Sequence, residues 1–357
     1  MIACRNILCL LLCLPSAGAV ITVSNGSASA LRAAVGAARA GDTVIVSGTY
    51  NLGSTGLATA ANGTAAQRIT LQGGPSGAVL VGGTSGNGIA IEHNYWSVSN
   101  LTITGFQKSF RIDSADHGII DNVTMNGSSG EAVKLRNTSR YWLIQHCRVA
   151  NAGAEGYYAG DADQNWEGGS VDTTSYITFY NCKAFQTAND GFDFKEGTHH
   201  IKLINCSTDF NYTTPGVLDR GNSGVYNRAS SLQVINFTTR NNNSLGNAIR
   251  NDRMTALDGN TYGSLGEFYN ISAQNLAGAF FRSDFADATL YSNYSTENVA
   301  GGLYESGSLQ PPILPSNAFV ELGWNGPSGQ IFATAVIPEP AGVMIPLSLL
   351  QLLARRR

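Results

Sequence analysis

The residues best suited to chemistry in this sequence lie in the segment 189–196, which reads NDGFDFKE. Asp190, Asp193 and Lys195 bring two carboxylates and an amine close together in the chain. Carboxylates are ligands for hard cations such as Ca²⁺, and a positioned lysine can transfer a proton. In a strand, alternation sends Phe192 and Phe194 to the core and leaves Asp193 and Lys195 on the outer face. The segment therefore predicts either a reaction centre or a solvated surface ion pair.

A repeat along the chain decides which residues share that outer face. Apolar strands end repeatedly in an asparagine, once in a histidine, and the next residue is always apolar or aromatic. The aligned residues are Asn100, Asn122, His146, Asn181, Asn205, Asn236, Asn270 and Asn293. Four of the steps are 22–24 residues long and three are 31–35 residues long. Such a period without a helical pattern is typical of a β-solenoid.

A second strand starts 11 residues after the aligned position, at Val133, Tyr157 and Phe192. We therefore expect an all-β protein, a right-handed parallel β-helix built as a single-stranded solenoid, with two short strands and an asparagine turn per rung. The composition agrees, because only 13% of the residues are charged and 41 are glycine. Residues 27–50 predict a capping helix that starts at Ser27 or Ser29, followed by a strand over Thr43–Val46.

The aligned positions also explain the cysteines of the mature chain. Cys147, Cys182 and Cys206 each follow a rung-marking residue. They are predicted to be free thiols stacked inside the solenoid, where cysteine behaves as a small hydrophobic residue. The asparagines themselves are interpreted as turn residues that hydrogen-bond from rung to rung.

Stacking of the rungs predicts a ridge of side chains about 4.8 Å apart around Asp193. The matching outward residues are Lys134, Tyr158, Asp193, Tyr226 and Arg250, followed at the next outward position, two residues on, by Arg136, Gly160, Lys195 and Arg228. The longer steps insert loops 159–174, 208–223 and 251–264, which carry carboxylates and aromatic residues. Long loops beside a rigid scaffold are where binding sites usually lie. We expect a sugar-binding groove here.

Two segments carry a resemblance to known families. The run NDGFDFK resembles the Asp-Asp-Gly-aromatic-Asp signature of family-nine polysaccharide lyases, with Asn189 in place of the first aspartate. The segments EGYYAG, NW and DFKEGT are similar to those of secreted bacterial right-handed β-helix proteins. Their matching residues are Glu155, Tyr158, Asn165, Trp166, Asp193, Lys195, Glu196 and Thr198. The whole repeat region is similar to pectate-lyase-like families.

The resemblance to the lyases implies Ca²⁺ bound by aspartates of adjacent rungs and a lysine that removes a proton from a uronic acid. The implied metal ligands are Asp161, Asp163, Asp190 and Asp193. The candidate catalytic residues are Lys195 and Arg228, because the strand in which the lyases place their lysine reads SGVYNR here. The candidate substrate-binding residues are Glu155, Tyr158, Trp166, Tyr226 and Arg250.

The function expected from these residues is a carbohydrate-active β-helix protein, with a Ca²⁺-assisted lyase of acidic polysaccharide as the leading hypothesis. A hydrolase that uses Asp190 and Asp193 is a variant of it. The alternative is a non-catalytic protein that binds glycan or forms part of a surface or exopolysaccharide matrix. Nucleic acid is not an expected partner, because the net charge is −3 and basic residues cluster only at the last three positions.

Both ends of the chain predict export. Residues 1–19 have an early arginine, a short apolar core and small residues before position 20, which is typical of a cleaved signal peptide. Residues 336–357 resemble the PEP-CTERM sorting signal of exported bacterial proteins, with Pro338-Glu339-Pro340, an apolar stretch and three terminal arginines. This resemblance implies sorting machinery as a partner and a transient anchor in the inner membrane. We expect a monomeric domain over residues 20–335 in the bacterial envelope, at the surface or in the extracellular matrix.

Overall fold

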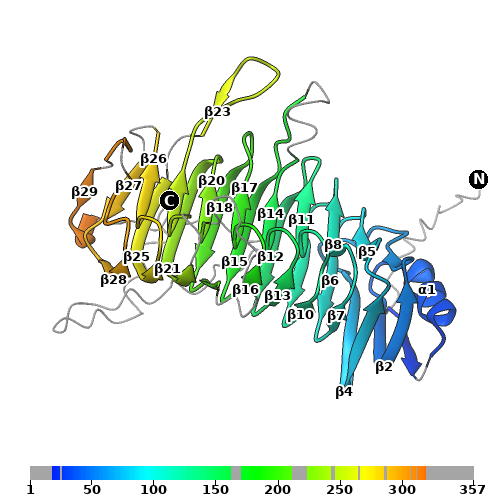
Figure 1. Ribbon diagram of the computed structural model, residues 1–357. Coiled ribbons are helices and arrows are strands. Elements are labelled where there is room, and N and C mark those ends of the chain that lie inside the picture. Colours follow the sequence, from blue (N-terminus) through cyan, green and yellow to red (C-terminus); the bar gives the residue numbers. More distant parts are fainter. Residues whose placement is uncertain are drawn as a thin grey trace, which may run out of the picture.

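Three parallel strands make up each regular turn of the chain, and the turns stack into an elongated solenoid (Figure 1). For example, β9 (Ile119–Asp121), β10 (Thr124–Asn126) and β11 (Val133–Arg136) pair with β12, β13 and β14 of the next turn. The computed structural model describes residues 18–24, 26–161, 170–210, 223–242, 246–263, 266–284, 288–305, 307–310 and 312–318. The expected all-β parallel solenoid is confirmed.

One strand of each turn belongs to a nine-stranded parallel sheet. Its strands are β3 (Leu57–Ala58), β5 (Asn87–Ile91), β8 (Lys108–Asp113), β11, β14 (Tyr157–Ala159), β17 (Phe192–Phe194), β20 (Val225–Asn227), β22 (Ile249–Asn251) and β26 (Phe281–Ser283). The strands follow one another in chain order across the sheet. Phe192 of β17 is one of the second-strand residues that lie 11 positions after a rung-marking residue. It pairs with Tyr157 on one side and Val225 on the other. The predicted offset of 11 residues therefore corresponds to this sheet.

The other strands form an 18-stranded sheet that follows the remaining faces of the solenoid. Its strands are β1 (Val20–Ser24), β2 (Thr43–Gly53), β4 (Ile69–Gly82), β6 (Trp96–Ser99), β7 (Thr102–Thr104), β9, β10, β12 (Arg140–Gln145), β13 (Arg148–Ala152), β15 (Ser175–Tyr180), β16 (Lys183–Thr187), β18 (His199–Ile204), β19 (Ser207–Asp209), β21 (Ser230–Asn242), β25 (Gly266–Leu276), β27 (Ala288–Tyr291), β28 (Tyr294–Val299) and β29 (Ile313–Leu314). A short antiparallel hairpin, β23 (Met254–Thr255) with β24 (Thr261–Tyr262), projects from the stack.

The expectation of two strands per rung is wrong, because the asparagine turn is a corner between two further strands. Asn122, for example, has a φ of 53° and stands between β9 and β10. Asparagine tolerates this left-handed conformation better than most residues, which explains its recurrence. The side chains also bond from rung to rung as predicted: Asn122 Nδ2 donates to Asn100 Oδ1 over 2.8 Å, and Asn236 Nδ2 donates to Asn205 Oδ1 over 2.8 Å.

A ladder of rings on the outer surface was not foreseen from the sequence. Tyr95, His117, Tyr141, Tyr176 and His200 lie at the starts of successive turns and stack face to face, with ring centroids 4.6–4.9 Å apart. All five residues have a positive φ between 54° and 61°. Stacked rings contribute beyond the area that they bury, so this ladder supports the corner that it lines.

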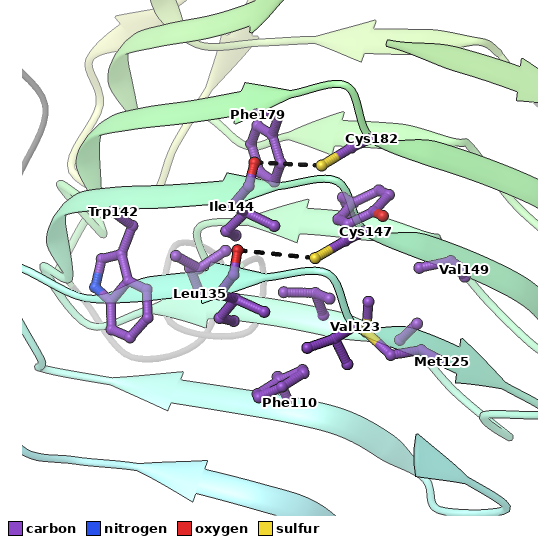
Figure 2. Packing of buried hydrophobic residues seen from close by; sticks show 14 of the residues in the cluster. Phe110, Val123, Met125, Leu135, Trp142, Ile144, Cys147, Val149, Phe179 and Cys182 are labelled. Carbon is purple, nitrogen blue, oxygen red and sulfur yellow. Dashed lines mark hydrogen bonds between the residues drawn. The ribbon is translucent and has the colours of Figure 1, made fainter. Parts of the chain in front are cut away.

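The three predicted thiols lie in the apolar interior, and Figure 2 shows Cys147 and Cys182 on neighbouring turns. Cys147, Cys182 and Cys206 are at most 2% exposed and form no disulfide. The Sγ of Cys182 donates to the carbonyl oxygen of Ile144 over 3.2 Å, and burial raises the pKa of this thiol well above its ordinary value. The prediction of free, stacked cysteines is confirmed.

The N-terminal helix α1 (Ala28–Ala37) packs on β1, β2 and β3 at one end of the solenoid (Figure 1). Ser27 is its N-cap, since its hydroxyl oxygen accepts from the Ala30 N–H over 3.1 Å. Leu31 and Val35 are buried in the core, so the helix covers the apolar end as expected. At the other end a 3₁₀ turn, η1 (Ser316–Ala318), follows β29. None of the helices in the described residues is long and apolar enough to span a membrane.

Candidate functional site

The expected ridge of side chains exists on the outer face of the nine-stranded sheet. Lys134 pairs with Tyr158, Tyr158 with Asp193, Asp193 with Tyr226, and Tyr226 with Arg250. The column continues beyond the predicted residues, to Arg111 before Lys134 and to Arg282 after Arg250. Both arginines could have been predicted from the sequence, because they are in register with the ridge residues. Neighbouring rungs therefore present cations and tyrosines in one line.

The centre of the ridge is a charged group formed by Asp193, Lys195 and Arg228. The Nζ of Lys195 donates to Asp193 Oδ2 over 2.6 Å, and Nη2 of Arg228 donates to Asp193 Oδ1 over 2.8 Å. The three residues are 1%, 8% and 5% exposed. The alternative interpretation, a solvated surface ion pair, is therefore wrong, although the side chains do point away from the core.

Aromatic rings on both sides explain how outward charges become buried. The ring of Tyr158 lies against Lys195, whose Nζ is 4.7 Å from the ring centroid. The ring of Tyr226 lies between two guanidinium groups, with Cζ of Arg228 at 4.2 Å and Cζ of Arg250 at 4.1 Å from its centroid. Cations are attracted to the faces of such rings. The tyrosines of the adjacent rungs thus cover the charges of the central one.

A tight turn after β17 holds Lys195 in place. The Lys195 N–H donates to the carbonyl oxygen of Ala159 on the preceding rung over 2.9 Å, and the Thr198 hydroxyl donates to the Lys195 carbonyl over 2.6 Å. Gly160 lies directly beside the lysine stem with a φ of 99°, and a Cβ added there would be 2.7 Å from the Cβ of Lys195. Glycine is therefore required at this contact.

The pKa values of Asp193, Arg228 and Tyr226 differ from the ordinary values of these groups. Burial would raise the pKa of Asp193, but Lys195 and Arg228 outweigh it, and the pKa lies below its ordinary value. Burial disfavours the charge of Arg228, but Asp193, Tyr226 and Glu196 raise the pKa of this guanidinium above its ordinary value. Arg228 therefore keeps its proton and acts as a fixed cation. Burial raises the pKa of Tyr226 to about 12.

Glu196 is a part of the site that motif reasoning placed in the turn without assigning it a role. It is fully buried, and its Oε2 is 3.5 Å from Nη1 of Arg228. Arg228 thus lies between two carboxylates, those of Asp193 and Glu196. This second carboxylate stabilises the guanidinium in a position where water does not reach it.

Three carboxylates meet beside the charged centre. One oxygen each of Glu155, Asp190 and Asp193 lies within 4.8 Å of the others. Burial, reinforced by the charge of Asp193, raises the pKa of Asp190 well above its ordinary value, and the same two causes raise the pKa of Glu155. The Asn189 amide donates to Glu155 Oε1 over 3.2 Å. Two of the three carboxylates therefore bind protons more readily than usual.

This cluster is a suitable donor set for a hard divalent cation. Ca²⁺ takes oxygen ligands at about 2.3–2.6 Å, so oxygens on opposite sides of it lie about 5 Å apart, which matches the separation within the cluster. Asp193 differs from the other two, because both of its oxygens already accept from Lys195 and Arg228.

The predicted metal ligands divide between this cluster and other places. Asp190 and Asp193 belong to it, and the carboxylate from the preceding rung is Glu155, which the sequence placed among the substrate-binding residues. Asp161 does not join it, because its Oδ2 pairs with Nη1 of Arg136 and its Oδ1 lies 3.6 Å from Nζ of Lys134. Asp163 and Trp166 lie outside the described residues.

Ion pairs flank the centre along the ridge. On the β8 and β11 side, Asp113 pairs with both Arg111 and Arg136. On the β22 and β26 side, Asp252 Oδ2 accepts from Arg250 over 2.5 Å, and its Oδ1 lies 3.4 Å from Nε of Arg282. Asp113 and Asp252 were not predicted, although they lie in the column of Arg136 and Arg228, two residues beyond Arg111 and Arg250. Charged groups that could recognise an anionic chain thus continue on both sides of the centre.

Comparison with known proteins agrees with this architecture. The model of a family described as "Pel9A-like, right handed beta helix region" matches residues 16–275. An alginate lyase from Paenibacillus sp. str. FPU-7 superimposes with a TM-score of 0.67 at 23% identity, covering 80% of this chain and 98% of that one. The pectate lyase Pel9A gives a TM-score of 0.59 at 13% identity, covering 92% and 90%.

A rhamnogalacturonan lyase also superimposes, with a TM-score of 0.57 at 16% identity, covering 78% of this chain and 79% of that one. A search of curated proteins finds no match. At these identities the likeness shows a shared fold. The expected right-handed course of the solenoid is confirmed by the family description.

Proposed function

Because the chain belongs to the family of Pel9A-like right-handed β-helix regions, we propose that it is an exported enzyme that cleaves an acidic polysaccharide by β-elimination. The observation that carries the proposal is the buried group of Asp193, Lys195 and Arg228 between the rings of Tyr158 and Tyr226. The similar solved structures include lyases of alginate, pectate and rhamnogalacturonan. They support the fold on which such a site would operate.

The free-energy cost of burying Asp193, Lys195 and Arg228 supports a functional role for these residues. Removing charged groups from water is expensive, and a buried ion pair is weak support for stability. A solvated lysine and aspartate would serve the outer face of a strand equally well. Buried charges with perturbed pKa values on one face are instead typical of catalytic sites. A structural or purely glycan-binding protein would not require this grouping.

Lys195 is the group that we assign to proton transfer. In β-elimination the C–H bond next to the sugar carboxylate breaks, its electron pair forms the new C=C bond, and the glycosidic C–O bond breaks. The neutral amine of Lys195 would accept that proton, and the leaving oxygen would then take a proton. Asp193 holds the lysine through one carboxylate oxygen, while Arg228 pairs with the other oxygen of the same carboxylate. Arg228 is thus a positioning residue rather than a second base.

The substrate-binding role falls to the residues that border the centre. Tyr226 offers aromatic surface on the rung after Asp193, while the buried ring of Tyr158 supports Lys195 from the rung before. Arg250 is half-buried against Tyr226 and can pair with a carboxylate of the polysaccharide. Successive cations at Lys134, Lys195 and Arg250 follow the direction of the stack, so an extended anionic chain would run along the ridge.

Glu155, Asp190 and Asp193 are the residues that would hold Ca²⁺. When bound there, the ion would offset the charge of the sugar carboxylate and so acidify the neighbouring C–H. The residues of the chain keep the other tasks: Lys195 moves the proton, Asp193 orients the lysine, and Arg228 fixes Asp193 through its second oxygen.

Export is proposed from the two ends of the sequence. A cleavage after residue 19 would leave β1 intact, because this strand begins at Val20 and pairs with β2 from Thr43 onwards. The sorting tail at 336–357 lies outside the described residues. The resulting protein would act on polysaccharide in the cell envelope or outside the cell.

The test is an assay of the mature chain on alginate, polygalacturonate, rhamnogalacturonan and a neutral glucan, with Ca²⁺ or with a chelator. β-Elimination creates a conjugated unsaturated uronate, which is followed by its ultraviolet absorbance. We expect absorbance to rise with at least one acidic polymer and not with the neutral one. Release of reducing ends without this absorbance would indicate hydrolysis, and binding without cleavage would indicate a non-catalytic glycan-binding protein. Either result would contradict the proposal.

A further inference from the structure

One column of outward-facing residues changes character along the 18-stranded sheet. On the N-terminal turns it contains Gln72, Ser99, Asp121 and Gln145, which are paired in register and all half-exposed. The same column continues through Tyr180, Ile204, Ile235 and Tyr269. A position that is polar on four turns is thus aromatic or aliphatic on the turns that follow.

The later residues of the column are buried, although they do not belong to the solenoid core. Ile204, Ile235, Tyr269 and Tyr291 are 1%, 1%, 3% and 5% exposed and form a separate apolar cluster with Tyr180 packed against it. The core is formed by their chain neighbours, such as Leu203, Val234 and Phe268. We call Tyr180, Ile204, Ile235, Tyr269 and Tyr291 the apolar flank.

A continuous apolar strip on an outer face requires a cover, because exposed patches of this kind are unfavourable in water. The helix of the described residues that could serve, α1, lies against β1, β2 and β3 at the opposite end of the solenoid. The polar residues at the same column positions on the first four turns need no such cover. The cover must therefore be specific to the C-terminal turns.

The course of the chain indicates which segment covers the apolar flank. The last described strand, β29, pairs with β27 so that Leu314 lies opposite Tyr291, the final residue of the apolar flank. The turn Ser316–Ala318 follows at once. The chain thus leaves the described part of the fold at the end of the strip that needs covering.

The sequence that follows has the composition and length for this task. Residues 319–335 read FVELGWNGPSGQIFATA and include six large apolar side chains: Phe319, Val320, Leu322, Trp324, Ile331 and Phe332. From Tyr180 to Tyr291 the flank covers five turns, a distance of about 19 Å at the spacing of adjacent strands. Seventeen residues can extend to about 55 Å, so even a bent segment would reach the whole flank.

We propose that residues 319–335 pack over the apolar flank of the same chain. The folded domain would then continue to residue 335 and not end with the last turn of the solenoid. The tail at 336–357 would start from the outer face of the 18-stranded sheet. Since the candidate site lies on the nine-stranded sheet, a tail held in this way leaves the ridge open to a polysaccharide while the protein is anchored.

The experiment is photo-cross-linking in the full chain, with benzoylphenylalanine in place of Tyr269. Gln145→benzoylphenylalanine is the matched control, because it occupies the same column on a turn where the face is polar and half-exposed. After irradiation, cleavage at glutamates gives peptides 306–321 and 322–357, because the bond between Glu339 and Pro340 resists cleavage, and fragmentation in the mass spectrometer identifies the linked residue. Tyr291→benzoylphenylalanine provides a second position should the first variant fail to fold.

We expect position 269 or 291 to link to a residue within 319–335 of the same chain, and position 145 to give no such link. Substituting Phe319, Trp324 and Phe332 with serine in the Tyr269 variant should abolish the link. A link to a second copy of the chain, a link to another segment, or a folded variant that gives no link would overturn the proposal.

Discussion

The Nζ of Lys195 lies 2.6 Å from Oδ2 of Asp193, and both residues are buried although they are on the outer face of the sheet. The other oxygen of Asp193 accepts from Arg228. One aspartate therefore balances two cations, and the rings of Tyr158 and Tyr226 cover the group. This relationship determines what substitutions in the site should do.

Asp193→Asn should lower the free energy of unfolding by about 3–5 kcal/mol, because removing one member of a buried ion group leaves the others uncompensated. Asp121→Asn is the control, since Asp121 also has a side-chain partner, Nδ1 of His146 at 2.8 Å, but is 36% exposed at its side chain. The control should change stability by about 0.5 kcal/mol or less. Denaturant unfolding of the two variants measures the difference, and equal stabilities would show that the Asp193 group is solvated.

Lys195→Ala should reduce kcat for the cleaved polysaccharide by about 10²–10⁴-fold, which is the usual contribution of a general acid or base. Lys195→Arg should not restore the rate, because a guanidinium hardly releases its proton. Lys183→Ala, at an exposed lysine of the 18-stranded sheet, should leave kcat unchanged. Steady-state kinetics check this prediction. A Lys195→Arg variant with the parent rate would assign the residue a purely electrostatic role.

Calcium should stabilise the parent protein but not Glu155→Gln. A ligand at 100 times its Kd adds about 2.7 kcal/mol to the free energy of unfolding, and removing one of three carboxylates weakens the site. Asp161→Asn should keep the calcium response, because Asp161 pairs with Lys134 and Arg136 outside the cluster. Thermal unfolding over a calcium titration distinguishes the two variants. The opposite pattern would place the ion at Asp161.

His117→Tyr should make the stability less dependent on pH. Burial lowers the pKa of His117 below 6.5, Arg68 and Arg140 lower it further, and Asp116 opposes them. Because the fold favours the neutral ring, this contribution is complete above about pH 6.5 and is lost as the pH falls through the folded pKa. Tyrosine already occupies the same ladder at 95 and 141 with a φ of 60° and 61°, so it should fit.

The measurement for His117 is denaturant unfolding between about pH 7 and pH 5, spanning the ordinary histidine pKa. The parent should lose more stability on acidification than His117→Tyr. Tyr141→Phe serves as the control, since it keeps both the stacked ring and the histidine and should behave like the parent. If both variants follow the parent curve, titration at position 117 does not influence folding.

The sequence by itself determined the repeat, the alignment of the rungs and the residues of the ridge. Each turn of a parallel solenoid buries the same positions as the one before it, so the inward residues recur in the chain and the register follows from their spacing. That is why Cys147, Cys182 and Cys206 could be placed inside, and why Tyr158, Asp193 and Tyr226 could be aligned. The third strand of each turn escaped notice because the asparagine corner that separates it is only two residues long.

Only the tertiary structure decided what surrounds each outward side chain. Strand alternation shows that Asp193 faces away from the core, but its burial depends on rings and guanidinium groups that reach over from adjacent rungs. The structure likewise places Glu155, and not Asp161, beside Asp190, because Asp161 forms ion pairs with Lys134 and Arg136. Periodicity indicates the direction of a side chain, whereas its burial, pairing and pKa are set largely by residues of adjacent rungs, such as Arg228, which lies 35 positions after Asp193 in the chain.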